Sequence, residues 1–370
     1  MANYLFFTGG YTETILMGTG ERLEGRCRGI GCYLFDPESG HAELLNRTDS
    51  TPNPSYILVG QKDDVLYCVN ELKSWNGVGG STVSAYRFDR RTGGLTLIAR
   101  QAVCGEDACH LSLTKDGSFL LVSNYSGGSV CMLPVRPDGG LSPACCLIQH
   151  VGHSTDSMRQ SSPHPHQTLP SPDGKHIFVP DLGIDQIKCY LLDETNKTLV
   201  PKPGRDIQGI PGQGIRHGVF AAGGSLYVMT ELACEINFYA HDRKSDAYTL
   251  RQIQACFHER PEPGSSGAAI RLDPAGRYVY ASVRGTDELF VFEIGCDGCL
   301  IPRQCVPCGG RTPREFTISP DGGWLLSANQ DSDSITVHAI DRKSGMLSLT
   351  SEVRDVPSVT TVAFAPDPNL

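Results

Sequence analysis

The sequence predicts an all-β protein, a seven-bladed β-propeller with four antiparallel strands in each blade. The first observation is an apolar run ending in a small or polar pair, which returns at intervals of 46 to 56 residues. The second is a pair of turn sequences that accompany the runs in a fixed order. Because each repeat reads as strands, a closed ring of sheets is the expected assembly. The repeated runs are LYCVNEL at 66–72, LLVSNYS at 120–126, IFVPDLG at 177–183, LYVMTEL at 226–232, VYASVRG at 279–285 and LLSANQD at 325–331.

The two turn sequences define the strands within each blade. The first turn contains Asp or Ala followed by Gly, as in TKDGS at 114–118 and SPDGK at 171–175, and it favours a tight hairpin. The second follows a strand rich in Val, Tyr and Phe, as in FDRRTGG at 88–94 and IDRKSGM at 340–346. The resulting order of strands and turns predicts four antiparallel strands in each repeat.

Counting these units gives seven blades, of which six are continuous in the sequence. The seventh is split between the ends of the chain: residues 3–49 supply its last three strands, and TTVAFAP at 360–366 supplies the first. We expect this segment to pair with Tyr4–Thr8, which would close the ring and remove two open sheet edges. The six continuous blades are predicted at 54–103, 108–150, 164–208, 214–256, 267–307 and 312–354.

Composition narrows the classes of function. The repeat runs almost end to end, so residues 1–370 are predicted to form a single domain, and we expect it to stand alone as a monomer. The formal net charge of −9 argues against a nucleic-acid partner. No apolar stretch is long enough for a membrane span, and the N-terminus lacks the pattern of a secretory signal, which predicts a cytoplasmic protein. The fifteen cysteines are therefore expected to be free thiols rather than a disulfide framework.

Two sets of positions are expected to face the ring axis at the same mouth. One set starts the first strand of each blade, and the other follows the second strand, which is antiparallel and so ends where the first begins. In the sequence alignment the first set is Tyr56, His110, His166, Arg216, Ala268 and Arg314. The second set is Glu71, Tyr125, Asp181, Glu231, Arg284 and Gln330. Such a gathering of His, Arg and Glu predicts an anion-binding acid/base site. A structural ion-pair network that fills the channel is the alternative.

The residue types suggest roles within that site. Arginine binds carboxylate or phosphate with paired hydrogen bonds, so Arg216, Arg284 and Arg314 indicate an anionic substrate. A histidine can move a proton near neutral pH, and Glu231 can orient it or act as a base. By pattern alone, histidines 164, 176, 217 and 338 are interpreted as packing or surface residues. The insertions at 11–28, 73–80, 152–163 and 257–266 are expected either to shape a pocket or to be surface loops.

A second candidate site is the segment CDGCLIPRQCVPCGG. It contains Cys296, Cys299, Cys305 and Cys308 in two C-x-x-C pairs, which resemble the halves of a zinc site. The pairs are closer together than in most zinc ribbons, and the segment also aligns with an ordinary hairpin. Free thiols are the favoured interpretation, so the sequence predicts no metal and no cofactor.

Beyond these patterns, long blocks of the chain resemble the seven-bladed propeller lactonase family. The blocks are HLSLTKDGSFLLVSNYSGGSV, PHPHQTLPSPDGKHIFVPDLGIDQI, GIRHGVFAAGGSLYVMTEL and RTPREFTISPDGGWLLSANQDSDSITV. The family contains bacterial 6-phosphogluconolactonases and fungal 3-carboxy-cis,cis-muconate lactonizing enzymes. The resemblance implies that His166, Arg216, Glu231 and Arg284 are catalytic, with His164 as the other candidate histidine. One departure is the start of the sixth blade, where Gly267 and Ala268 offer no side chain to a substrate.

Three functions are weighed on this basis. The preferred one is a metal-independent hydrolase of an anionic sugar lactone, of the 6-phosphogluconolactonase type, with no cofactor. The second is a carboxymuconate cycloisomerase, in which a substrate carboxylate adds to its own double bond. The third is a non-catalytic binding scaffold. The residues expected to bind substrate are His110, Arg314, Tyr125, Glu71, Asp181, His164 and Gln330. A metal-dependent propeller using Glu71, Asn124 and Asp181 as ligands is also considered, and the family resemblance argues against it.

Overall fold

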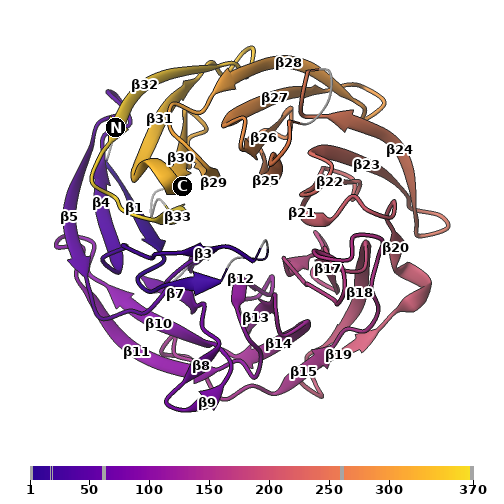
Figure 1. Ribbon diagram of the computed structural model, residues 1–370, viewed down its shortest axis with the longest axis horizontal. Helices are drawn as coiled ribbons and strands as arrows, with labels where there is room; N and C mark the ends of the chain where they lie inside the picture. The colour runs from indigo at the N-terminus through magenta and orange to yellow at the C-terminus, as the bar shows by residue number, and fades with distance from the viewer. Residues whose placement is uncertain (1–2, 17, 19, 61–63, 259–261, 367–370) are drawn as a thin grey trace.

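The computed structural model is a ring of seven antiparallel sheets, six of four strands and one of five, arranged around a central axis (Figure 1). It describes residues 3–366 except 17, 19, 61–63 and 259–261. The chain runs once around the ring, blade after blade, and the predicted seven-bladed propeller is confirmed. Helical structure in the described part of the chain is limited to the short 3-10 turns η1 (Pro203–Arg205) and η2 (Gln330–Ser332).

The blades follow the boundaries that the repeat predicts. The first blade consists of β6 (Ile57–Val59), β7 (Val65–Asn70), β10 (Thr82–Phe88) and β11 (Leu95–Ala102). The second consists of β12 (Ala108–Leu113), β13 (Phe119–Asn124), β14 (Ser129–Pro134) and β15 (Cys146–Gln149). The third is β16 (Leu169–Pro170), β17 (His176–Asp181), β18 (Gln186–Asp193), β19 (Thr198–Pro201), and β20 (Ile207–Gln208) also pairs with β18. The fourth is β21 (Ile215–Phe220), β22 (Leu226–Thr230), β23 (Glu235–Asp242), β24 (Ala247–Ala255). The fifth consists of β25 (Ser266–Leu272), β26 (Tyr278–Arg284), β27 (Glu288–Ile294) and β28 (Leu300–Pro307). The sixth consists of β29 (Pro313–Ile318), β30 (Trp324–Asn329), β31 (Ser334–Ile340) and β32 (Leu347–Val353).

The last blade joins the two ends of the chain and closes the ring. It consists of β33 (Val359–Phe364), β1 (Tyr4–Gly10), β4 (Ile30–Phe35) and β5 (Ala42–Thr48). Strand β33 pairs with β1 in antiparallel register, with Phe6 opposite Phe364. The Phe6 ring stacks on Tyr33 at a centroid distance of 4.8 Å. This pairing, which the sequence predicts, gives β1 a partner on both sides and joins the two ends of the chain in one blade.

The tight turns within the blades form as the Asp-Gly sequences predict. In the turn between β12 and β13, Asp116 accepts hydrogen bonds from the Thr114 hydroxyl and the Ser118 amide, and Gly117 takes a positive φ of 79°. Asp173 makes the same contacts in the turn before β17. An aspartate that bonds to its own turn, followed by a glycine free to take positive φ, fixes each hairpin locally.

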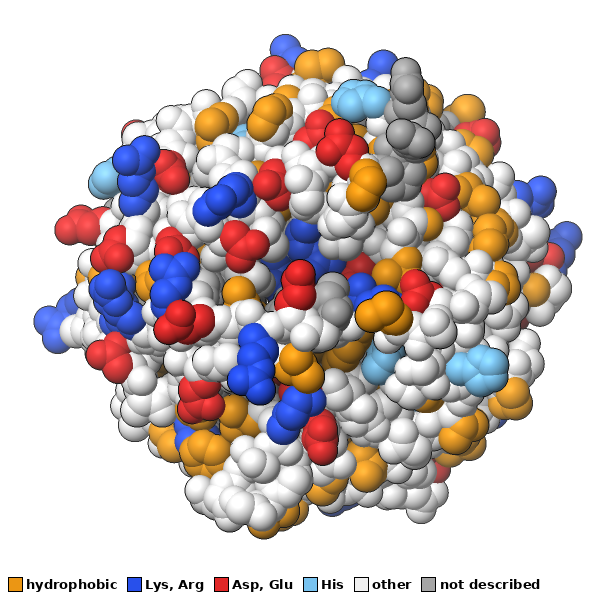
Figure 2. Space-filling model, in the orientation of Figure 1, with side chains coloured by type: hydrophobic (Ala, Val, Ile, Leu, Met, Phe, Trp, Pro, Cys, Tyr) orange, Lys and Arg blue, Asp and Glu red, His pale blue; other side chains and the backbone are white. Residues whose placement is uncertain are grey.

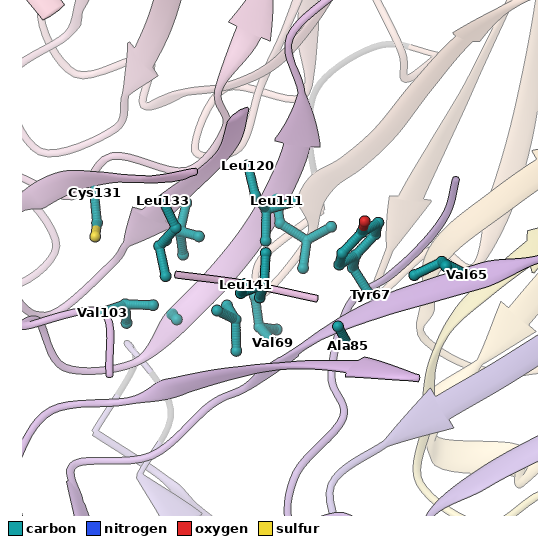
Figure 3. Packing of buried hydrophobic residues seen from close by; sticks show 13 residues of the cluster. Val65, Tyr67, Val69, Ala85, Val103, Leu111, Leu120, Cys131, Leu133 and Leu141 are labelled. Atoms are coloured by element: carbon teal, nitrogen blue, oxygen red, sulfur yellow. The ribbon is translucent and has the colours of Figure 1, made fainter. Parts of the chain in front are cut away.

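The hydrophobic core is divided among the interfaces between neighbouring blades. One cluster brings Tyr67, Val69 and Ala85 of one blade against Leu120 and Leu133 of the next (Figure 3). The other apolar clusters among the described residues lie between the remaining neighbouring blades. Because each sheet buries both faces against its neighbours, the polar positions collect at the strand ends and along the axis.

A local irregularity in the innermost strands sets the direction of the axial side chains. In β12, β21 and β29 one residue is skipped in the pairing with the second strand, which is a β-bulge. The skipped residues are Cys109, Arg216 and Arg314. A bulge turns the extra residue out of the regular alternation. These three positions are therefore equivalent in their blades.

The inserted segments 11–28 and 152–163 both reach the ring axis on one face. The first carries the hairpin of β2 (Ile15–Leu16) and β3 (Arg22–Leu23), which crosses towards the centre in Figure 1. The segment at 73–80 forms a second small hairpin, β8 (Ser74–Trp75) with β9 (Val78–Gly79). Among the described residues there is no helix with the length and apolar character needed to span a lipid bilayer.

Candidate active site

A cavity of about 370 Å³ opens at the centre of the ring, on the face that carries the 11–28 segment. Lys and Arg side chains lie at the bottom of a hollow in this face, ringed by acidic groups (Figure 2). The lining comes from the strand ends of several blades and from both inserted segments. The polar side chains that line it include Tyr11, Glu71, Tyr125, Arg159, His166, Glu231, Arg284 and Arg314.

Glu231 is the centre of the charge network at the floor of this cavity. Its Oε2 atom accepts a hydrogen bond from Arg216 Nε at 2.9 Å and lies 3.1 Å from Arg284 Nη2. Its Oε1 atom lies 2.5 Å from Arg159 Nη2. Three guanidinium groups thus share one carboxylate, and the Glu231 side chain is only 6% exposed. The repeat-based prediction that Arg216, Glu231 and Arg284 come together is therefore met by the geometry.

The backbone of β25 holds two of these arginines in place. The Ala268 carbonyl accepts a hydrogen bond from Arg216 Nη1 at 2.6 Å, and the Gly267 carbonyl accepts one from Arg284 Nη2 at 3.1 Å. A Cβ atom on Gly267 would lie 2.2 Å from the Thr230 carbonyl oxygen, so only glycine fits there. The blade that begins with Gly267 and Ala268 offers no side chain to a substrate at this position. Its backbone carbonyl groups instead orient Arg216 and Arg284.

His166 lies beside this network and is buried. Its Nε2 atom is 4.0 Å from Glu231 Oε2, and its Nδ1 atom is 3.8 Å from the Cys109 sulfur. Burial, reinforced by the charge of Arg216 and opposed by Glu231, holds the pKa of His166 well below its usual value. The imidazole is therefore neutral at neutral pH and keeps a lone pair that can accept a proton.

The carboxylate and guanidinium groups have shifted acidities as well. Burial alone would raise the pKa of Glu231, but the charges of Arg284, Arg159 and Arg216 outweigh it and hold the pKa well below the usual range. Burial lowers the pKa of Arg284 to about 10, against the opposing effect of Glu231. At neutral pH the floor thus presents a charged carboxylate, charged guanidinium groups and a neutral imidazole.

A second cluster of polar side chains also lines the cavity. The Tyr11 hydroxyl lies 3.2 Å from both oxygens of Glu71 and accepts a hydrogen bond from Arg314 Nη2 at 2.8 Å. Ser55 donates a further short hydrogen bond to Glu71. Burial raises the pKa of Glu71, although Arg314 opposes this effect. Glu71 and Arg314, both predicted site residues, therefore line the cavity, and the Tyr11 hydroxyl connects them.

Tyr125, the remaining predicted residue that lines the cavity, connects it to two other side chains. Its hydroxyl accepts a hydrogen bond from Arg159 Nη2 at 3.3 Å. Its ring stacks on His164 with a centroid distance of 4.4 Å and meets His166 edge-on at 5.4 Å. Of the two histidines in the PHPH block, His166 lines the cavity, whereas His164 packs behind Tyr125 and bonds its carbonyl oxygen at 3.0 Å.

The predicted place of Asp181 in this site is wrong. It is fully buried outside the cavity, 2.7 Å from His150 Nδ1, and it also accepts hydrogen bonds from the amides of His164 and Gly183. Asp181 is the last residue of β17, the position that Asn124 occupies in β13, so the sequence alignment is displaced by one residue there. Glu71 lines the cavity, whereas Asn124 and Asp181 do not, so the considered metal site of these three residues does not come together there.

His110 and Gln330 also lie outside the set of described residues that line the cavity. His110 follows the bulged Cys109 and so belongs to the next layer down the axis, where its ring lies 4.4 Å from Tyr56 and 5.5 Å from His217. Gln330 is buried, and its amide nitrogen donates to Asp331. The true equivalent of Arg216 in this blade is Cys109, which does face the cavity.

This second layer forms a buried polar cluster beneath the floor. His217 Nδ1 lies 3.9 Å from Glu315 Oε2, and Arg271 Nη2 lies 2.9 Å from Glu315 Oε1. Arg271 also donates to the Tyr56 hydroxyl at 3.2 Å. A small void between the layers is bordered by Cys109, His166, Arg216, His217 and Glu315. The prediction of a packing role for His217 is consistent with its place here, since it supports the floor from below.

Several residues that line the cavity were missed by sequence reasoning, among them Tyr11, Cys109 and Arg159. Tyr11 and Arg159 come from inserted segments, which lie outside the repeat and so have no equivalent in other blades. Cys109 was displaced in the alignment by the β-bulge. In the sequence, Arg159 is a single basic residue in a Gly- and Ser-rich insertion. Such a residue by itself does not predict a binding site.

The cysteines do not form the zinc site considered from sequence. All fifteen are free, and Cys32, Cys68, Cys131 and Cys189 are buried in strands as predicted. Among the described residues, the one group of His, Cys, Asp or Glu side chains close enough together to share a metal ion is His258, Glu288 and Cys305, which includes one of the four C-x-x-C cysteines. Cys308 is buried and contacts the Gly310 carbonyl instead.

Taken together, the floor combines a neutral histidine with a cluster of guanidinium groups around one carboxylate. Arg159, Arg216 and Arg284 share Glu231, and Arg314 bonds to the Tyr11 hydroxyl beside Glu71. The other two lining carboxylates are engaged elsewhere: Asp107 pairs with Lys73, and Asp156 accepts hydrogen bonds from amides of its own segment. Such a site can bind an anion, polarise a carbonyl oxygen and accept a proton from water.

Comparison with known proteins gives a consistent picture. A family described as "Lactonase, 7-bladed beta-propeller" matches residues 6–364. The 6-phosphogluconolactonase of Bacillus subtilis strain 168 is 29% identical over 366 residues, covering 98% of this chain and 99% of the relative. A 6-phosphogluconolactonase of Formosa agariphila is 30% identical, over 86% of this chain and 90% of the relative.

Solved structures share the fold over nearly the full chain. A periplasmic gluconolactonase of Pseudomonas aeruginosa superposes with a TM-score of 0.89 at 31% identity, covering 99% of this chain and 100% of that one. A putative 6-phosphogluconolactonase of Bacteroides fragilis gives a TM-score of 0.87 at 28% identity, covering 99% and 98% of the two chains.

Proposed function

Because the chain belongs to the seven-bladed β-propeller lactonase family, we propose that it hydrolyses an anionic sugar lactone of the 6-phosphogluconolactone type. The chain is a lactone hydrolase by family, and the proposal concerns its substrate and its mechanism. The observation that carries it is the cavity floor, where the guanidinium groups of Arg159, Arg216 and Arg284 surround the single carboxylate of Glu231 beside a neutral histidine. A phosphate ester carries close to two negative charges at neutral pH, which complements this excess.

In the proposed mechanism His166 is the general base. Its neutral imidazole accepts a proton from a water molecule as the water oxygen attacks the lactone carbonyl carbon. The carbonyl oxygen becomes an oxyanion, which Arg284 and Arg216 stabilise. The intermediate then collapses: the bond from the carbonyl carbon to the ring oxygen breaks, and the imidazolium returns the proton to the leaving alkoxide.

Glu231 has a supporting part in this proposal. Its low pKa makes it a poor base, since it stays ionised well below neutral pH. Its carboxylate instead fixes the directions of Arg216 and Arg284, and its negative charge stabilises the imidazolium that forms on His166 4.0 Å away. Of the two bases considered from the sequence, the geometry favours His166.

The second candidate is the lactone-forming cycloisomerase. It would use Arg216 and Arg284 for the carboxylates of a muconate and His166 for proton transfer at carbon, so the cavity suits it as well. The named relatives are lactonases, which favours hydrolysis. The third function considered, a non-catalytic binding scaffold, is not supported, because these relatives are enzymes.

Two assays test the proposed function. The protein, treated with a chelator, should release acid from 6-phosphogluconolactone well above the spontaneous rate, because arginines supply the positive charge in the proposed mechanism. Loss of activity on chelation, restored by a divalent metal, would contradict the metal-independent mechanism. A fall in the ultraviolet absorbance of 3-carboxy-cis,cis-muconate, without lactone hydrolysis, would favour the cycloisomerase.

The predicted cytoplasmic location and monomeric state stay predictions. One structural relative is a periplasmic enzyme, so the family is not tied to one compartment. Size-exclusion chromatography with light scattering tests the monomer, and cell fractionation tests the compartment.

A further inference from the structure

Among the described residues, Arg159 is the guanidinium group at the cavity floor that comes from an inserted segment rather than from a blade. It comes from the inserted segment 152–163, which the described contacts hold in a defined shape. Asp156 accepts hydrogen bonds from the amides of Met158 and Arg159, each at 2.9 Å. Gln160 is fully buried and donates to Asp185 at 2.6 Å. The segment therefore presents Arg159 on an anchored loop rather than on a free surface strand.

The Arg159 side chain reaches into the cavity with part of its bonding capacity unused. Its Nη2 atom contacts Glu231 and the Tyr125 hydroxyl. Its Nε atom is buried and has no hydrogen-bond partner. The Tyr125 hydroxyl accepts from Arg159, so its own proton remains available for another acceptor. Arg159 and Tyr125 thus offer several donors towards the same space.

The balance of charge indicates that these donors are meant for an anion. Glu231 already accepts from Arg216 and lies against Arg284, so one carboxylate cannot neutralise the third guanidinium group as well. Ser265, which lines the same cavity, has a buried hydroxyl without a hydrogen-bond partner. An unpaired donor set around a positive centre is the arrangement that phosphate recognition uses.

We propose that Arg159, together with the Tyr125 hydroxyl, forms the subsite for a phosphoryl group on the substrate, at the part of the cavity bordered by the 152–163 segment. This inference rests on the proposed function, in which Arg216, Arg284 and His166 act on the lactone carbonyl. Arg159 then determines specificity: it selects a phosphorylated lactone over the same ring without phosphate.

The test compares two substrates that differ only in the phosphoryl group, 6-phosphogluconolactone and δ-gluconolactone. The variants are Arg159→Gln, Arg159→Lys and a control, Met158→Gln, at a neighbouring side chain that is 77% exposed. In Arg159→Gln the ratio of the two kcat/KM values should fall by about 10- to 100-fold, the effect of losing a hydrogen bond to a charged group. The loss should appear mainly in KM for the phosphorylated lactone. Arg159→Lys keeps the positive charge but loses the paired N–H donors of the guanidinium group, so its ratio of kcat/KM values should be intermediate. The ratio for Met158→Gln should match that of the wild type.

An equal loss on both substrates would overturn the proposal, because it would mean that Arg159 acts only by positioning Glu231. Circular dichroism of each variant checks that the fold is retained.

Binding of inorganic phosphate gives a second readout that does not depend on turnover. Titration calorimetry should show weaker phosphate binding to Arg159→Gln than to the wild type, by about tenfold or more. Unchanged phosphate affinity would overturn the subsite. If the wild type hydrolyses neither lactone, the proposed function fails, and this titration still decides whether Arg159 binds a phosphoryl group.

Discussion

The Nε2 atom of His166 lies 4.0 Å from the Oε2 atom of Glu231, beyond hydrogen-bond distance but close enough for their charges to interact. The carboxylate is engaged instead by arginines, of which Arg216 Nε is 2.9 Å away. The pair therefore differs from a histidine held by a directly bonded acid. Glu231 would stabilise the imidazolium only when the proton arrives.

The pH dependence of hydrolysis follows from the acidity of His166. Burial and the charge of Arg216 lower the pKa of His166 well below 6.5, so the base stays neutral as the pH falls through that value. We expect kcat/KM to remain nearly constant from pH 8 to below 6.5 and to decline only at lower pH. Initial rates with δ-gluconolactone, which has no ionisable group in this range, measure this profile. An acid limb centred at or above pH 6.5 would contradict it.

Replacing Glu231 with Gln tests its role at the centre of the network. The substitution keeps the shape but leaves the three neighbouring arginines without a counter-charge, in a site where Glu231 is 6% exposed. We expect the free energy of unfolding to fall by about 3 to 5 kcal/mol, as for a broken buried ion pair. We also expect kcat to fall by roughly 100-fold, because the imidazolium loses its stabilising charge. Urea unfolding and initial rates measure the two effects.

Glu43→Gln, on the exposed face of the outer strand β5, is the matched control and should change neither quantity. A loss of stability below about 1 kcal/mol in Glu231→Gln would show that the arginines do not depend on this carboxylate.

His338 allows a test of stability against pH away from the cavity. It is buried in β31, and burial lowers its pKa to about 4. The folded pKa lies below the unfolded value, so the unfolded chain takes up a proton between pH 6.5 and about 4 that the folded protein cannot. Stability is thus lost as the pH falls, by about 3 kcal/mol over this range for this group.

His338→Leu removes that proton uptake. The decline in the free energy of unfolding between pH 7 and pH 4.5 should be smaller in the variant than in the wild type, as measured by urea denaturation. Identical slopes in the two proteins would mean that His338 is protonated in the folded state over this range.

Most of the fold could be predicted from sequence because its signals are local and repeated. Apolar runs set the second strands, and aspartate–glycine turns set the hairpins, as Asp116 and Asp173 do. Even the closure of the ring could be predicted, since the segment that pairs with β1 has the pattern of a first strand.

The candidate site was harder to predict because a side chain's direction depends on pairing that a sequence does not display. The bulge at Cys109 moves His110 into the second layer, and a one-residue displacement removes Asp181 from the cavity. Arg159 and Tyr11 come from insertions, so no repeat could locate them. By contrast, Glu231 directly follows the regular second strand β22 and Arg284 ends β26, and their convergence follows from the ring itself.

The central claim is that His166, held in a neutral state beside the arginine-bound Glu231, activates water for lactone hydrolysis. The most direct measurement is the initial rate of acid release from 6-phosphogluconolactone by the wild type and by His166→Gln, at neutral pH and after subtraction of the spontaneous rate. We expect clear acceleration by the wild type and a loss in kcat of about 100-fold or more in the variant, with its fold retained. A folded His166→Gln protein with wild-type kcat would contradict the account.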